Sequence, residues 1–152
     1  MARLSPVLPV VGPDTRFQPV YVGDVAEAAE AAVTRAVDPG VYELGGPAVL
    51  SFKQLLEFVL ATTARKRLLL PLPWAAGKIL AAMTFFLPNP PVTADQLESL
   101  KTDNVVSDLA KREGRTLEGL GLAPRNIEAI VPSYLYRYRK AGQFTAPSGM
   151  PE

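Results

Sequence analysis

Residues 15–32, TRFQPVYVGDVAEAAEAA, run from a short apolar segment through an aspartate into an alanine-rich segment. Residues 20–22 are β-branched or aromatic, which favours a strand. Asp24, with Glu27 three residues later, has the pattern of a helix N-cap followed by a carboxylate, so a helix is predicted to start at Asp24 and to end near residue 38. The predicted apolar face of this helix consists of mostly small residues, namely Val25, Ala28, Ala29, Ala32, Val33 and Ala36.

The alternation of strand and helix continues in the next segment. VYEL at residues 41–44 predicts a second strand, which the following Gly-Gly-Pro would end. Ser51 and Gln54 form a capping box, so a helix is predicted from residue 52 to about residue 64. The order strand, helix, strand, helix indicates an α/β fold.

Further elements follow towards the C-terminus. LLLPLP at residues 68–73 predicts a buried strand or extended segment, and residues 74–87 predict a very apolar helix. A second capping box, Thr93 with Gln96, predicts a helix that runs to about residue 103.

The last third of the chain has weaker patterns. TLEGLGLAP at residues 116–124 predicts a helical turn and a loop, and residues 125–131 predict a final helix that Pro132 interrupts. Residues 1–144 are expected to form one domain and residues 145–152 a flexible tail. Two or three short strands leave sheet edges exposed, so the chain is expected either to pair with itself or to be part of a larger protein.

The sequence contains no histidine and no cysteine. Zinc fingers, haem ligation through histidine and Ser-His-Asp or Cys-His catalysis are therefore excluded, and no metal site is predicted. Any catalysis would have to rest on Tyr, Lys, Asp, Glu or Ser. The formal net charge of +1 gives no large field to steer nucleic acid, so nucleic-acid binding is not expected.

Residues 65–88, RKRLLLPLPWAAGKILAAMTFFLP, combine a basic cluster, a tryptophan and an almost wholly apolar helix that is too short to cross a bilayer. One interpretation is a helix buried between two layers or in a dimer. Its core-facing residues would be Ile79, Leu80, Met83, Phe86 and Leu87. The other interpretation is an interface with a membrane surface or a membrane-protein partner. That interface would consist of Arg65, Lys66, Arg67, Trp74, Lys78 and Phe85.

Several segments occur in an order that resembles a known family: QPVYVGDV, VYELGGPAVLSFKQLLEFV, LPLPW, PPVTADQLESLKTDNVVS, TLEGLGL and an aromatic, arginine-bearing C-terminal end. The set is similar to the C-terminal, substrate-side portion of atypical and extended short-chain dehydrogenases, in the NAD-dependent epimerase/dehydratase superfamily. It looks most like one branch, the nucleotide-binding accessory subunit of respiratory complex I and its bacterial relatives. The resemblance covers residues 8–144.

The resemblance implies a mainly helical, substrate-side α/β domain with two or three short strands, preceded in the parent chain by an N-terminal Rossmann half. The family's glycine-rich phosphate turn and Tyr-x-x-x-Lys pair lie in that half. No catalytic and no cofactor-binding residue is therefore expected here, and NADP(H) or NAD(H) is expected only for a full-length parent. Tyr136 and Lys140 also match Tyr-x-x-x-Lys, but in the wrong place for the family's pair, and are expected to be packing and surface residues.

The resemblance further implies a function as a non-catalytic accessory or assembly module of NADH:ubiquinone oxidoreductase, complex I. The expected partners are complex I subunits or the membrane surface. The expected location is cytoplasmic and peripheral to the inner membrane in a bacterium, or the matrix side of the mitochondrial membrane in a eukaryote.

Two alternatives remain. The first is a fragment of an NAD(P)-dependent oxidoreductase or epimerase that acts on a small or lipid-like substrate, with a pocket formed by Gln18, Tyr21 and Trp74. Related epimerases carry a phosphate-binding arginine where this chain has Phe17, with Arg16 one place off, which counts against an epimerase. The second is a stand-alone α/β binding protein that dimerises through its open sheet edge.

Overall fold

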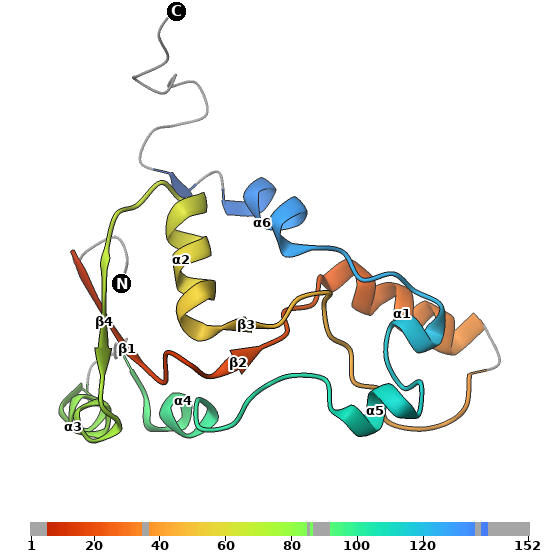
Figure 1. The fold of residues 1–152 in the computed structure, drawn as a ribbon, viewed down its shortest axis with the longest axis horizontal. Helices are drawn as coiled ribbons and strands as arrows, with labels where there is room; N and C mark the ends of the chain where they lie inside the picture. Colours follow the sequence, from red (N-terminus) through yellow and green to blue (C-terminus); the bar gives the residue numbers. More distant parts are fainter. Residues whose placement is uncertain (1–5, 35–36, 85, 87–91, 136–137, 140–152) are drawn as a thin grey trace, which may run out of the picture.

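The structure, a computed structural model, describes residues 6–34, 37–84, 86, 92–135 and 138–139. Short strands and helices alternate along an elongated molecule (Figure 1). In chain order the elements are β1 (Val7–Val11), β2 (Arg16–Phe17), α1 (Val22–Thr34), β3 (Leu50–Ser51), α2 (Phe52–Thr62), β4 (Leu68–Leu72), α3 (Trp74–Thr84), α4 (Ala94–Ser99), α5 (Asp108–Arg112), the 3₁₀ helix η1 (Glu118–Leu120) and α6 (Ile127–Leu135).

The strands pair as two separate two-stranded sheets. β1 and β4 are parallel, with Val7 opposite Leu68 and Val11 opposite Leu72. β2 and β3 are antiparallel, and Phe17 of β2 also bridges to Asn104. The predicted fold class, a mainly helical α/β domain with few and short strands, is confirmed.

The core at one end of the molecule forms where α3 and α4 cover the end of the parallel sheet (Figure 1). Val11 of β1, Ala81 of α3 and Leu97 of α4 are buried together, with Leu72 and Val92 packed against them. Gly77 allows the close approach of α3, because a Cβ atom at this position would lie 2.8 Å from Cγ2 of Val11. A glycine in the middle of this helix therefore has a packing role.

Both predicted capping boxes are confirmed. Oγ of Ser51 accepts a hydrogen bond from the Gln54 amide at 3.2 Å, and Oε1 of Gln54 accepts one from the Ser51 amide at 2.8 Å. Thr93 and Gln96 make the same reciprocal pair at 3.2 and 3.1 Å. These bonds satisfy amides that the first turn of a helix leaves unpaired, so α2 and α4 begin where the sequence predicts. α4 is shorter than predicted and ends at Ser99.

The predicted strand at residues 20–22 is wrong. The strand in this segment is β2, and α1 already begins at Val22. Asp24 therefore lies in the first turn of α1 and is not its N-cap, and its amide donates to the Tyr21 carbonyl at 3.0 Å. Between β2 and α1 the chain is held by the Gln18 side chain rather than by a neighbouring strand.

The predicted strand at residues 41–44 is also wrong, since this segment pairs with no strand. It crosses to the C-terminal third of the chain, where the Glu43 amide donates to the Arg115 carbonyl at 3.0 Å. The Glu43 carboxylate then accepts hydrogen bonds from Ser107. Polar contacts with residues far away in the sequence decide this conformation, against the local preference for a strand.

The buried face of α1 differs from the predicted one. Asp24, Ala28 and Ala31 are buried, whereas Val25 and Val33 are exposed. The helix is turned so that the Asp24 carboxylate meets its partner Arg125, because a buried charge without a partner costs more than an exposed valine.

Predictions for the apolar segment after α2 are partly wrong. β4 is a strand as predicted, but Leu68 and Leu70 are exposed. In α3 the predicted core residues Ile79 and Met83 are exposed, as is Phe86, because the helix uses its small residues for packing. Leu87 lies outside the described residues.

Further differences concern elements at the two ends of the chain. The sequence patterns missed β1, because Pro6 and Pro9 interrupt the apolar run in which it lies. They also missed α5, which is a single short helical turn. α6 continues through Pro132, although a break was predicted there. The predicted flexible tail at residues 145–152 lies outside the described residues.

The most enclosed apolar side chain belongs to Leu117, which is 0% exposed. Leu117→Ala is expected to lower the free energy of unfolding by about 2–4 kcal/mol, because it removes buried methyl groups and leaves a cavity. Leu109→Ala is the matched control, since Leu109 is 58% exposed, and should change that energy by less than about 0.5 kcal/mol. Urea unfolding followed by circular dichroism measures both, and similar losses in the two variants would contradict the assignment.

Candidate functional site

An ion-pair cluster joins the start of α1 to the segment that leads into α6. The Arg125 amide donates to Oδ2 of Asp24 at 2.7 Å, and its Nη1 lies 3.0 Å from Oδ1 of the same carboxylate. Nη2 of Arg125 also pairs with Glu27. The hydrogen bond to Glu27 raises the pKa of Arg125 above its ordinary value. Asp24 is 1% exposed, so this carboxylate is buried and serves to hold two distant segments together.

Tyr21 belongs to the same cluster. Its ring lies 5.4 Å from the guanidinium carbon of Arg125, a cation–π distance, and its hydroxyl lies 3.5 Å from the hydroxyl of Tyr134. The hydrogen bond to Tyr21 raises the pKa of Tyr134. The direction of this shift is opposite to the tuning that a phenolate base requires.

Gln18 joins two other distant segments. Its Nε2 donates to the Gly46 carbonyl at 2.8 Å, and its Oε1 accepts from the Val106 amide at 3.0 Å. The side chain borders a cavity of about 260 Å³. The cavity is also lined by Glu43, Leu44, Gly45, Asn104, Val105 and Val106.

Glu43 fixes the wall of this cavity. Its carboxylate accepts from the Ser107 amide at 2.7 Å and from the Ser107 hydroxyl at 2.9 Å. Ser107 also accepts from the Ala110 amide as the N-cap of α5. The bond from the Ser107 amide, followed by that from its hydroxyl, lowers the pKa of Glu43. The Gln18 amide and the Glu43 carboxylate are therefore each hydrogen-bonded to other groups of the chain.

Trp74 lies away from both the ion-pair cluster of Asp24 and the cavity beside Gln18. It is the first residue of α3, and a Cβ atom on Gly12 would lie 3.1 Å from Cη2 of its ring. Gly12 has φ +63°, a left-handed conformation. Both this backbone conformation and the nearby Trp74 ring therefore favour glycine at this position. α3 and α1 lie at opposite ends of the long axis in Figure 1. The structure therefore does not bring Trp74 together with Tyr21, and Gln18 borders a separate cavity.

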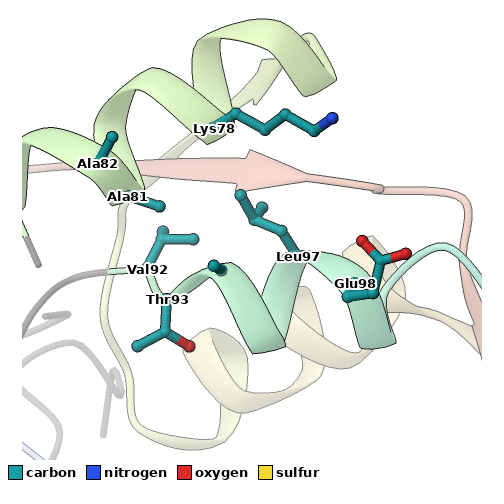
Figure 2. Close-up of a pocket in the computed structure, with 8 residues that line it drawn as sticks. Lys78, Ala81, Ala82, Val92, Thr93, Leu97 and Glu98 are labelled. Atoms are coloured by element: carbon teal, nitrogen blue, oxygen red, sulfur yellow. The ribbon is translucent and has the colours of Figure 1, made fainter.

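A cavity of about 390 Å³ lies between α3 and α4 (Figure 2). Ala81, Val92 and Leu97 give it an apolar wall, and Lys78 and Glu98 extend from the two helices on the same side. The pKa of Glu98 is lowered, mainly by its hydrogen bond from Lys101 and to a lesser extent by Lys78. Lys78 is thus positioned on the exposed rim of an apolar cavity.

The predicted basic cluster is gathered in one groove. Arg65, Lys66 and Arg67 line a groove of about 680 Å³ together with Lys53 and Glu57. Leu60, Leu68 and Leu69 supply its apolar lining. Nη2 of Arg65 donates to the Tyr138 carbonyl at 3.0 Å. Phe85, which was predicted with this interface, and the Tyr136 and Lys140 pair lie outside the described residues.

The sequence patterns missed a further apolar groove of about 600 Å³ beside β1, α2 and α4. It is lined by Leu8, Pro9, Val11, Phe52, Leu56, Val92, Asp95, Gln96, Ser99 and Leu100. The groove depends on β1, and only the valines of VLPVV in an otherwise proline-rich stretch signalled that strand.

Acidic side chains and apolar helices within residues 6–34, 37–84, 86, 92–135 and 138–139 form neither a metal cluster nor a membrane span. In that part of the chain no three acidic side chains come together as a set that would hold a metal ion. None of the helices described there is both long enough and apolar enough to cross a bilayer.

The N-terminus of α1 does not have the form of a phosphate-binding turn. In nucleotide-binding folds a helix N-terminus following a glycine-rich turn faces the phosphates. Here the first turn of α1 contains the buried Asp24 carboxylate, which is paired with Arg125. Gly23, the glycine of that turn, is closely approached by the Tyr21 ring, which occupies the space above it.

No protein-family model matches the sequence. The chain is 35% identical over 150 residues to the NADH dehydrogenase (ubiquinone) 1 alpha subcomplex subunit 9, mitochondrial, of Arabidopsis thaliana. This match covers 89% of the chain and 36% of the relative, so the chain spans much less than the relative's full length. A solved structure, the crystal structure of gox2253, is similar with a TM-score of 0.55 and 25% identity, covering 88% of this chain and 41% of that one.

Asp24→Ala tests the ion-pair cluster. The variant removes the acceptor of the Arg125 amide and the ion-pair partner of its guanidinium, and is expected to lower the free energy of unfolding by about 2 kcal/mol. The expected loss is below that of a fully buried pair because the Arg125 side chain is partly exposed. Glu30→Ala, an exposed position on the same helix, is the control, and an equal loss there in a urea titration would argue against the cluster.

Glu43→Gln tests the contact with Ser107. The folded state lowers the pKa of Glu43 below its ordinary 4.5, so the stabilisation is present above that value and is lost as the pH falls through the lower folded value. The variant should be less stable than the parent at about pH 7, and the difference should shrink at about pH 3. Urea titrations at both pH values measure it. A difference that stays constant with pH, as expected for Leu109→Ala, would exclude the proposed contact.

Proposed function

The chain is a homologue of the alpha subcomplex subunit 9 of NADH dehydrogenase (ubiquinone), and from that relationship we propose that it is a non-catalytic accessory or assembly module of NADH:ubiquinone oxidoreductase. The observation that carries the proposal is the 35% identity over 150 residues, which extends over 89% of the chain. A similarity of that length involves the fold as a whole and does not depend on one short motif. The proposed partners are other subunits of the same enzyme complex.

The contacts of the polar side chains support a non-catalytic role. Asp24 and Arg125 hold α1, and both polar ends of the Gln18 amide hold backbone groups. The raised pKa of Tyr134 disfavours a phenolate base at neutral pH. Side chains that are engaged in this way stabilise the fold.

The alternative, a fragment of an oxidoreductase or epimerase, has less support. Arg16, the arginine nearest to the position of the epimerase phosphate ligand, makes a hydrogen-bonded ion pair of 2.8 Å with Asp103. Its guanidinium is therefore directed to a carboxylate of the same chain. Within the accessory role, binding of NADP(H) or NAD(H) is assigned to a longer parent chain, and the location is peripheral to the membrane that holds the complex.

Affinity purification tests the accessory role. The tagged chain is expressed in its source and recovered from membranes solubilised in a mild detergent, so that shared lipid does not carry an association. Mass spectrometry is expected to find subunits of NADH:ubiquinone oxidoreductase enriched over a tag-only control. The same subunits should co-migrate with the chain on a density gradient. Recovery of the chain alone, or as a homodimer, would contradict the proposal.

A further inference from the structure

One end of the molecule carries an apolar surface made by β4 and α3. Leu68 and Leu70 are 64% and 46% exposed and, being two residues apart, lie on the same face of the strand. Leu72 lies on that face too, where it packs against the core below α3 and α4. α3 follows the Leu72 end of β4 (Figure 1), and Leu68 and Leu70, nearer the other end of the strand, are exposed.

The outer face of α3 extends this surface. Gly77 and Ala81 are buried and point towards β1, whereas Ile79 and Met83 are 61% and 66% exposed. The two exposed residues are four positions apart and so lie on one face of the helix. Trp74, at the start of the helix, is also more than one third exposed. Ile79 and Met83 of α3 thus point away from the core.

Cations flank the same surface. The groove formed by Lys53, Arg65, Lys66 and Arg67 holds Glu57 as its one acidic lining residue, and Lys53 pairs with Glu57 at 3.8 Å. The groove shares Leu68 with the apolar surface, and β4 leads from the groove to Trp74. Lys78 lies on the rim of the cavity on the other side of α3. Basic side chains therefore lie at both margins of the exposed leucines and of α3, with Glu98 beside Lys78 at the second margin.

We propose that this surface, formed by the basic groove, β4 and the outer face of α3, docks onto an anionic phospholipid bilayer. The basic side chains would contact headgroup phosphates while Leu70, Trp74 and Ile79 enter the boundary with the acyl chains. Lysine and arginine beside aliphatic and tryptophan side chains suit an anionic membrane surface. The charge of the groove is the observation that selects this partner.

The exposed valines of α1 provide an internal comparison. Val33 is 86% exposed, and Glu30 lies three positions before it on the same side of the helix. An apolar surface with acidic neighbours would be repelled by an anionic bilayer. The two ends of the molecule thus differ in charge, and only the β4 and α3 end is assigned to the membrane.

Vesicle sedimentation of the purified chain tests the proposal. The chain should sediment with vesicles of phosphatidylcholine mixed with phosphatidylglycerol and remain in solution with phosphatidylcholine alone. Lys66→Glu combined with Arg67→Glu should weaken binding to the mixed vesicles by at least about tenfold, since each basic residue near an anionic surface contributes roughly a fivefold factor. Ile79→Ser combined with Met83→Ser should also weaken binding, at unchanged charge.

Matched controls are Lys111→Glu and Val33→Ser, which change a lysine and an apolar residue at exposed positions outside the surface. Both should bind the mixed vesicles within about twofold of the parent chain, apart from the general effect of net charge. Circular dichroism and thermal melting confirm that each variant folds. No binding of the parent chain to mixed vesicles, or equal losses in the test and control variants, would overturn the proposal.

The vesicle experiment tests membrane docking independently of the accessory role, because the vesicles contain no protein. The affinity purification tests the accessory role independently of lipid, because it is done in detergent. Binding to vesicles without capture of enzyme subunits would refute the accessory role alone. A different outcome would refute membrane docking: the parent chain does not bind vesicles, but it captures enzyme subunits in detergent, and Lys66→Glu combined with Arg67→Glu abolishes that capture. This outcome would identify a protein partner for the groove.

Discussion

A set of side-chain hydrogen bonds joins residues 15–24 to the C-terminal third of the chain, and the elongated fold depends on it. Arg16 pairs with Asp103, Gln18 accepts from Val106, and Asp24 accepts from Arg125. The sheets are only two strands wide, so ladder hydrogen bonds alone cannot connect the segments. The polar side chains supply these connections, and their pairing explains why few of them remain for chemistry.

The sequence patterns predicted elements whose signals are local. A capping box needs only residues three positions apart, and the boxes of α2 and α4 were found at Ser51 and Thr93. Strands were predicted less well because their pairing depends on remote residues. Residues 20–22 have the composition of a strand, yet the Gln18 contacts and the burial of Asp24 place them at the start of a helix instead.

The candidate sites show the same difference between local and long-range signals. The basic cluster was visible in the sequence because its residues are consecutive, and the structure adds Lys53 from α2 to the same groove. The ion pair of Asp24 and Arg125 was not foreseen, because about 100 residues separate its members and no local pattern links them. α3 was ambiguous for a physical reason: a helix apolar all round does not indicate which face is buried, and the small residues Gly77 and Ala81 decided it.

The parallel pairing of β1 and β4 has a consequence for how the chain folds. Val7 pairs with Leu68, so a loop of about 60 residues must close before the two strands pair. Contacts between residues so far apart in the sequence slow folding. During synthesis β1 emerges first and has to wait for its partner while α1 and α2 form. The burial of Val11 against Ala81 and Leu97 therefore depends on segments that are synthesised well after β1.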